Sequence, residues 1–241
     1  MYTPRHFAMP AELQQAILAA PGVGDLITHS SEGLSATHLP YLFDPAMGEH
    51  GSLVLHVARP NQQWRESPDG EALFIITTAS DYISSLWYPS AVESGKYVPT
   101  WDYVTLHLYG RLTVHDDLVW TTSAVERLMA RHETRIGLTD MPADYLGGQL
   151  RAIVGLQLQV TRIEAKAKLS QNRTPEDVRG VIGGLDEVGA APMSALVEHY
   201  ALPAAERRAA LIADVAARHR PGPDSLGGGR EIGTATPSQG A

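Results

Sequence analysis

Residues 104–114 alternate between two kinds of side chain. The even-numbered positions carry valine, leucine or glycine, whereas the odd-numbered positions carry threonine, histidine, tyrosine or arginine. Because successive side chains of a β-strand point to opposite faces, this pattern predicts a strand with one face in the core. A strand of this length is long enough to curve around a barrel.

Other segments supply partners for such a strand. Residues 152–160 repeat the alternation, with apolar side chains at the even-numbered positions. Shorter strand signals occur at residues 26–28, 34–43, 53–58 and 73–78. A polar turn at residues 30–33 joins the first two into a hairpin, and Pro40 indicates an edge position or a bulge in the second.

Helix signals lie mostly after the strands. Residues 10–20 form the first predicted helix, with Leu13, Ile17 and Leu18 on one face. A second is predicted for residues 118–132, capped by Asp116 or Asp117. Strands and helices do not alternate regularly, which argues against a doubly wound parallel sheet. The order favours an α+β, mainly β class: an antiparallel barrel with peripheral helices.

The C-terminal part is predicted to be helical. Thr174 and Pro175 open a helix that we expect to end at Gly183 and Gly184, and two more helices are expected within residues 192–219. We expect Gly147 and Gly148 to break a shorter helical piece. Residues 220–241 are rich in glycine, proline, serine and threonine, which predicts a disordered tail.

Composition excludes several classes of function. The chain has no cysteine, so it holds no disulfide, thiolate zinc site, iron–sulfur cluster or cysteine nucleophile. The 19 Lys and Arg residues and 27 Asp and Glu residues give a net charge of −8, which does not favour tight binding to DNA. No signal-peptide run or membrane-length apolar stretch is present, so we expect a soluble, cytoplasmic protein.

Common catalytic and metal motifs are absent from the sequence. The ten histidines include no pair at the i, i+4 spacing of a helical metal site, and no metal site is predicted. No phosphate-binding glycine loop and no Gly-x-Ser-x-Gly elbow occur, and no residue is assigned a catalytic role.

Three segments carry the residue types of a ligand site. Residues 82–90 and 97–103 combine aromatic rings with hydroxyl groups, which suits either a planar ligand or a subunit contact. Residues 166–173 form the densest cationic patch, directly before a helix N-terminus, and suit a phosphate or a flavin edge. Arg59 and Asn61 follow a predicted strand and could hold a phosphate.

The sequence resembles the PaiB family of FMN-binding negative transcriptional regulators. The resemblance covers residues 1 to about 185 and rests on seven ordered motifs, at residues 1–7, 37–40, 56–64, 82–88, 98–103, 109–112 and 168–173. It implies an FMN-binding split barrel at residues 1–185. It also implies a homodimer with flavin at the subunit interface, and repression of sporulation and protease genes. Residues 190–219 lie beyond the usual end of the family and are predicted from the sequence to form a C-terminal helical extension.

The resemblance also implies the cofactor-binding residues. Arg59 and Asn61 would form the phosphate side, with His38 and His56 on the barrel face, and Trp101 and Tyr103 would approach the isoalloxazine. The remaining residues would close the site from the same chain or from its partner: Lys168, Ser170, Gln171, Asn172 and Arg173. The chain departs from the family pattern at Ser85, where proline is usual, and at Asp102, where asparagine is usual. We expect Asp102 to add negative charge to the aromatic segment.

Three other functions stay open from the sequence. A split barrel also suits a flavin-dependent oxidoreductase, in which the cofactor carries the chemistry. It also suits a haem-binding or haem-degrading protein, with His38 or His56 as the axial ligand. A third alternative is a binding module without a cofactor.

Overall fold

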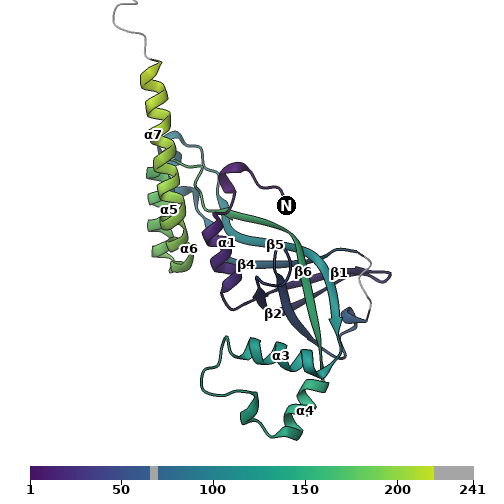
Figure 1. Cartoon of the computed structure of the whole chain (residues 1–241). Helices are drawn as coiled ribbons and strands as arrows, with labels where there is room; N and C mark the ends of the chain where they lie inside the picture. The colour runs from purple at the N-terminus through teal and green to yellow at the C-terminus, as the bar shows by residue number, and fades with distance from the viewer. Residues whose placement is uncertain (66–69, 220–241) are drawn as a thin grey trace, which may run out of the picture.

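A closed antiparallel barrel forms the centre of the molecule. The computed structural model describes residues 1–65 and 70–219, so the predicted tail at 220–241 lies outside the described residues. The described part contains six strands, which close in the order β1-β2-β3-β6-β5-β4. They are β1 (Gly22–Ser30), β2 (Gly33–Asp44), β3 (Ser52–Ala58), β4 (Ala72–Ile83), β5 (Thr100–His115) and β6 (Ile153–Lys168). The antiparallel barrel predicted from the alternation is confirmed (Figure 1).

The alternating apolar residues of β5 and β6 face the core, as predicted. Val104, Leu106 and Leu108 of β5 are fully buried, as are the even-numbered residues of β6 from Val154 to Leu158. Both strands are longer than the pattern indicates. The pairing shifts by one residue where Gly110 meets Val160, so the alternation of β6 changes phase there although the strand continues. A Cβ on Gly110 would lie 2.1 Å from a backbone oxygen of β6, which explains the glycine.

The first hairpin also forms as predicted. β1 and β2 pair from Gly22 with Tyr41 to Ser30 with Gly33. β2 pairs with β3 only from Leu42 onward, so Pro40 has a partner strand on one side alone, which is where a residue without an N–H is tolerated.

Helices pack around the barrel and at its ends. The α-helices are α1 (Ala11–Ala19), α2 (Pro89–Ser94), α3 (Leu118–Met129), α4 (Ala143–Arg151), α5 (Pro175–Glu187), α6 (Ala191–Leu196) and α7 (Leu202–Arg218). A π-helical turn, η5 (Val197–Ala201), joins α6 to α7. Short 3-10 turns are η1 (Arg5–Phe7), η2 (Gln62–Trp64), η3 (Ser85–Trp87) and η4 (Leu138–Asp140). No helix of the described residues is long and apolar enough to cross a membrane.

One hydrophobic core joins the barrel to the C-terminal helices. The apolar face of α1, with Leu13, Ile17 and Leu18, belongs to the same buried cluster as the barrel interior. Val181 of α5 and Met193 of α6 belong to it as well. Figure 1 shows α5, α6 and α7 side by side near one end of the barrel, with α3 and α4 near the other.

Two predicted helix breaks are wrong. Gly147 and Gly148 lie inside α4, and α5 continues past Gly183 and Gly184 to Glu187. In α5 the reason is packing, because a Cβ on Gly184 would lie 2.2 Å from the ring of Trp87. The glycine allows η3 to sit directly on the helix.

The two neighbouring glycines of α5 provide a matched test of this packing. We expect Gly184→Ala to lower the free energy of unfolding by about 1–3 kcal/mol, because the new methyl group overlaps Trp87. Gly183→Ala meets no atom within 4 Å and should leave stability unchanged or raise it by up to about 1 kcal/mol, since alanine favours helix. Urea unfolding of both variants measures the difference, and equal effects would contradict the packing.

Candidate functional site

The predicted site residues lie at two opposite ends of the barrel. Arg59 directly follows β3 and lies beside the start of β6. Its backbone N–H donates to the carbonyl of Ala152, the residue before β6, at 2.8 Å. Tyr103 pairs with Lys168 at the far end of β6. Figure 1 shows β6 running from the end of the barrel near α4 to the end near the C-terminal helices. The predicted residues therefore form two separate groups within one chain.

Arg59 is held by its own chain. Its guanidinium makes a bidentate ion pair with Asp116, at 2.6 and 3.1 Å, and its Nε donates to the Arg151 carbonyl at 2.6 Å. The Arg59 hydrogen bonds lower the pKa of the Asp116 carboxyl. Asp117, not Asp116, caps α3, accepting a hydrogen bond from the Trp120 N–H at 2.8 Å.

A hollow of about 400 Å³ lies beside Arg59. Its lining includes Arg151, for which the structure describes no carboxylate partner within residues 1–65 and 70–219, and the first turn of α3. Two arginines and a helix N-terminus are the groups that bind a phosphate. In the hollow, Asp116 competes with any anion for Arg59.

Asn61 performs a structural role. Its side-chain oxygen accepts from the Gln63 N–H at 2.8 Å and so caps η2, while its amide donates to the Thr37 hydroxyl at 3.0 Å. Gln63 is buried and donates in turn to the Leu26 carbonyl at 3.0 Å. Both polar ends of Asn61 are thus used to fasten the loop after β3 to the first hairpin.

The two predicted histidines have different surroundings. His38 is exposed and its Nδ1 lies 2.8 Å from Asp25 on β1. His56 on β3 is half-buried, and burial lowers the pKa of its imidazole. His56 and His115 both pair with Gly155, and the Trp120 ring stacks on His115 at 4.2 Å. A Cβ on Gly155 would lie 2.2 Å from Trp120, so the glycine admits this aromatic cover.

At the end of the barrel where β5 begins and β6 ends, Asp102 connects several polar side chains. It is fully buried, and its carboxylate accepts from Lys168 Nζ at 3.0 Å and from the Ser170 hydroxyl at 2.6 Å. Burial raises the pKa of the Asp102 carboxyl, while the hydrogen bond from Ser170 and the charge of Lys168 act in the opposite direction. The expectation that Asp102 adds charge to the aromatic segment is wrong, because this even-numbered residue of β5 points inward.

The segment after β6 is also tied down. Ser170 has a left-handed backbone, with φ of 61°, and its bond to Asp102 helps to hold this conformation. Gln171 donates to the Ala167 carbonyl at 2.6 Å, and Arg173 lies 4.3 Å above the Tyr88 ring. Asn172 is exposed. Lys166 and Lys168 belong to strand β6, so the predicted cationic patch is in part a strand.

The aromatic segments form an exposed surface at this end. Trp101 is 56% exposed and Tyr82 is 49% exposed, and their rings meet edge to face at 6.1 Å. Tyr103 is half-buried, with Lys166 Nζ 5.1 Å from its ring. Trp101 and Tyr82 thus offer aromatic faces that the chain does not cover.

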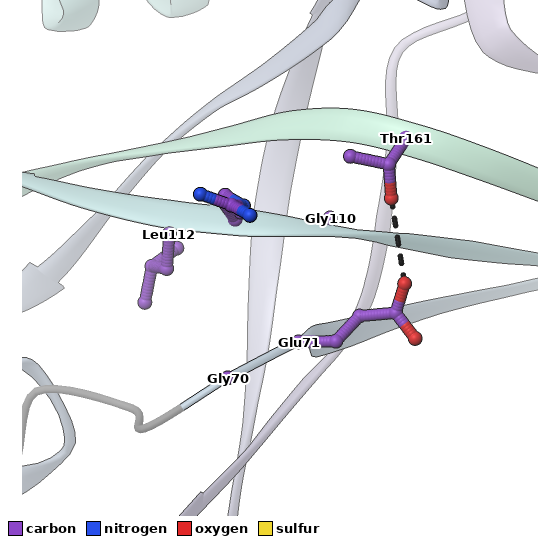
Figure 2. Close-up of a pocket in the computed structure, with 6 residues that line it drawn as sticks. Gly70, Glu71, Gly110, Leu112 and Thr161 are labelled. Carbon is purple, nitrogen blue, oxygen red and sulfur yellow. Dashed lines mark hydrogen bonds between the residues drawn. The ribbon is translucent and has the colours of Figure 1, made fainter.

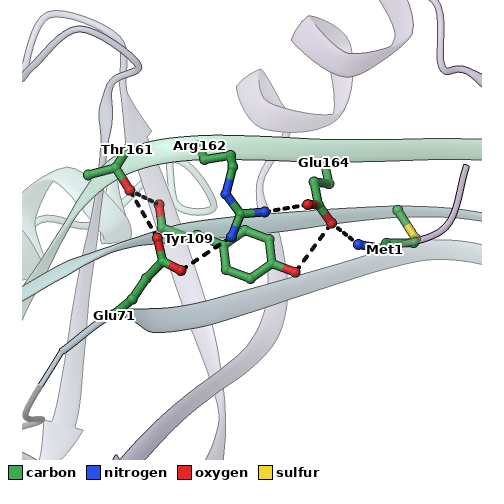
Figure 3. A network of polar contacts seen from close by, with 6 residues as sticks. All are labelled: Met1, Glu71, Tyr109, Thr161, Arg162 and Glu164. Carbon is green, nitrogen blue, oxygen red and sulfur yellow. Dashed lines mark hydrogen bonds and ion pairs between the residues drawn. The ribbon is translucent and has the colours of Figure 1, made fainter.

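The outer face of β5 and β6 carries a polar network that the sequence did not predict. Arg162 lies 3.5 Å above the Tyr109 ring and pairs with Glu71 at 3.2 Å and with Glu164 (Figure 3). Glu164 also pairs with the amino group of Met1. Opposite charges neutralise each other along this face.

Arg111 is the residue of this face that sequence reasoning missed. It lines a hollow of about 590 Å³ together with Glu71, Gly110 and Thr161, and Figure 2 shows Glu71 bonded to Thr161 there. Within the described ranges no carboxylate engages the Arg111 guanidinium. Its place in the motif at residues 109–112 was the available signal, but an arginine on an alternating strand gives no sign of whether it is paired.

Comparisons with known proteins give a consistent result. The family model described as "Putative FMN-binding domain" matches residues 1–162. The "Protease synthase and sporulation protein PAI 2" of Bacillus subtilis is 32% identical over 187 residues, which cover 76% of this chain and 87% of that protein. An uncharacterized protein of Saccharomyces cerevisiae is 26% identical over 156 residues, covering 56% and 92% of the two chains.

Solved structures with a similar course of the chain have lower sequence identity. A conserved hypothetical protein of Mycobacterium tuberculosis is 12% identical, with a TM-score of 0.49, and covers 70% of this chain and 91% of that chain. The "FAD and Heme binding protein" of Mycobacterium smegmatis is 13% identical, with a TM-score of 0.48, and covers 68% and 74%.

The burial of Asp102 predicts a specific pH dependence. Because its pKa is raised in the folded state, the folded protein binds this proton more tightly than the unfolded chain does. The resulting stability is fully present below the pKa of an unfolded aspartate, about 3.9, and is lost as the pH rises through the folded pKa. Asp102→Asn removes this contribution.

Urea unfolding across a pH series measures it. The free energy of unfolding of the wild type, relative to Asp102→Asn, should fall as the pH rises from about 3 to about 7. Asp186→Asn, at an exposed position of α5, is the control and should follow the wild type throughout. Parallel curves for Asp102→Asn and the wild type would show that the carboxyl titrates normally.

Proposed function

Because the chain belongs to the FMN-binding domain family, we propose that it acts as an FMN-binding homodimer in which each flavin lies between two chains. The family model and the relative from Bacillus subtilis confirm the resemblance to the PaiB family. When bound, FMN supplies one- or two-electron redox chemistry.

The separation of the candidate residues carries this proposal. The exposed rings of Trp101 and Tyr82 suit an isoalloxazine. Two cations of the predicted patch at this end are engaged within the chain, Lys168 by Asp102 and Arg173 by the ring of Tyr88. The hollow beside Arg59 suits a phosphate but lies at the other end of β6. A flavin that uses both kinds of group therefore needs the aromatic end of one chain and the arginine end of another.

The function we infer for this dimer is regulatory. The relative from Bacillus subtilis carries sporulation and protease synthesis in its name. A net charge of −8 opposes tight binding to DNA by the barrel itself. The proposed mechanism is therefore indirect: occupancy or redox state of the flavin changes a surface that another macromolecule recognises.

Asp116 provides a test of the phosphate side. If Arg59 binds the FMN phosphate, Asp116→Asn should tighten FMN binding by several-fold, because it frees the guanidinium and removes a negative charge. Arg59→Ala should weaken FMN binding about tenfold or more. Fluorescence quenching of FMN during titration measures both.

The control is Arg65→Ala, which removes an exposed arginine from the same loop, stacked 5.0 Å from the Trp64 ring, and should leave FMN affinity unchanged. A purely structural role for Arg59 would be revealed if Asp116→Asn and Arg59→Ala both lowered stability and neither changed FMN affinity.

A mixing experiment tests whether the site is shared between chains. The Arg59→Ala dimer and the Trp101→Ala dimer should each bind FMN weakly, because both flavin sites of each dimer then lack one of the two side chains. In a mixed dimer one site carries both substitutions and the other carries neither. Mixing the two proteins should therefore restore binding at wild-type affinity, with one FMN per mixed dimer.

Differently tagged chains, refolded together and purified by both tags, give the mixed species. Titration with FMN then measures its stoichiometry. If the mixed dimer binds no better than its parents, Arg59 and Trp101 belong to the same site within one chain or to no flavin site.

A further inference from the structure

A small cavity lies where residues 6–12 meet the C-terminal helices. Its volume is about 270 Å³. Residues 6–12 form one wall, the end of β6 and the segment after it form the floor, and η5 with the start of α7 forms the other wall. Ala167 and Leu169 of the floor are fully buried. Much of this lining lies beyond the residues that the family model matches.

One exposed side chain of each charge borders the cavity. Arg207 and Glu12 both line it. Over residues 1–65 and 70–219, no hydrogen bond or ion pair engages either side chain, and the two do not pair with each other. The other arginines of α7 differ: Arg208 donates to the Gln171 carbonyl at 2.7 Å, and Arg218 pairs with Asp214 at 2.6 Å.

Two imidazoles add hydrogen-bonding groups to the walls. His6 meets the ring of Phe7 edge to face at 4.1 Å, and His199 meets Tyr200 in the same way at 4.6 Å. Both histidines line the cavity. Their aromatic neighbours orient the rings, whereas no described hydrogen bond uses the nitrogens.

His199 lies within the π-helical turn η5. The Leu202 N–H donates to the Val197 carbonyl, five residues back. Pro203 follows and has no N–H, so one carbonyl of this turn lacks its helical donor. His199, Tyr200 and Pro203 also line an adjoining open hollow of about 810 Å³. Single π-turns of this kind often occur at functional sites.

We propose that this cavity binds a small zwitterion of the amino-acid type, with its carboxylate on Arg207 and its ammonium group on Glu12. A simple anion would face the Glu12 carboxylate, and a simple cation would face Arg207. A molecule with both charges satisfies both side chains, while the imidazoles provide further donors to the carboxylate. The adjoining hollow leaves room for a side chain.

Matched small molecules test the charge requirement. L-alanine carries both charges, propionate lacks the ammonium group, and ethylamine lacks the carboxylate. Titration of the full chain, followed by the NMR signals of the His6 and His199 rings, should show saturable shifts with L-alanine and much weaker ones with the other two. Arg207→Gln and Glu12→Gln should each weaken L-alanine binding about tenfold or more.

The control is Arg218→Gln, which removes an arginine of the same helix outside the cavity and should bind L-alanine as the wild type does. All these variants should bind FMN normally, which separates this site from the proposed flavin site. The proposal is overturned if L-alanine does not saturate the histidine signals, if propionate or ethylamine binds equally well, or if Arg207→Gln binds like the wild type.

Discussion

The pairing of β5 with β6 constrains every other part of this molecule. The two strands run side by side from Tyr103 with Lys168 to His115 with Gly155, and together they span the barrel from end to end. The one-residue shift at Gly110 lets both strands keep a buried face on either side of it. Because β6 runs from one end of the barrel to the other, Arg59 and Trp101 of one chain lie at opposite ends (Figure 1). The proposed flavin site therefore combines the aromatic end of one chain with the arginine end of another.

Contacts with residues distant in the sequence determine which cations remain available. Lys168 lies in a dense cationic stretch of sequence, yet Asp102 neutralises it inside the protein. Arg59 is paired with Asp116, and Arg208 donates to backbone carbonyls. Among the described residues, Arg111, Arg151 and Arg207 have no carboxylate partner, and all three lie outside that stretch. Local charge density therefore does not identify an anion site here, because an ion pair depends on residues distant in the sequence.

The sequence predicts much of the fold, but it predicts fewer features of the candidate site. Alternation identified β5 and the first half of β6, since buried and exposed faces follow the period of the strand. Alternation did not reveal the second half of β6. The register shift opposite Gly110 moves the inward-facing residues of β6 from even to odd positions. The glycine pairs in α4 and α5 were wrongly predicted to end or break these helices. Gly184 lies inside α5 because its missing side chain leaves room for the Trp87 ring. Motifs identified the family, but not the inward direction of Asp102 or the partner of Arg59.

Size and flavin content measured together test the central claim most directly. The protein is incubated with FMN, passed through a gel-filtration column, and monitored by light scattering and visible absorption. The account predicts a flavin spectrum that elutes with a species of twice the 26.0 kDa chain mass, at one FMN per chain. Flavin eluting with a single chain, or a dimer that retains no flavin, would contradict it.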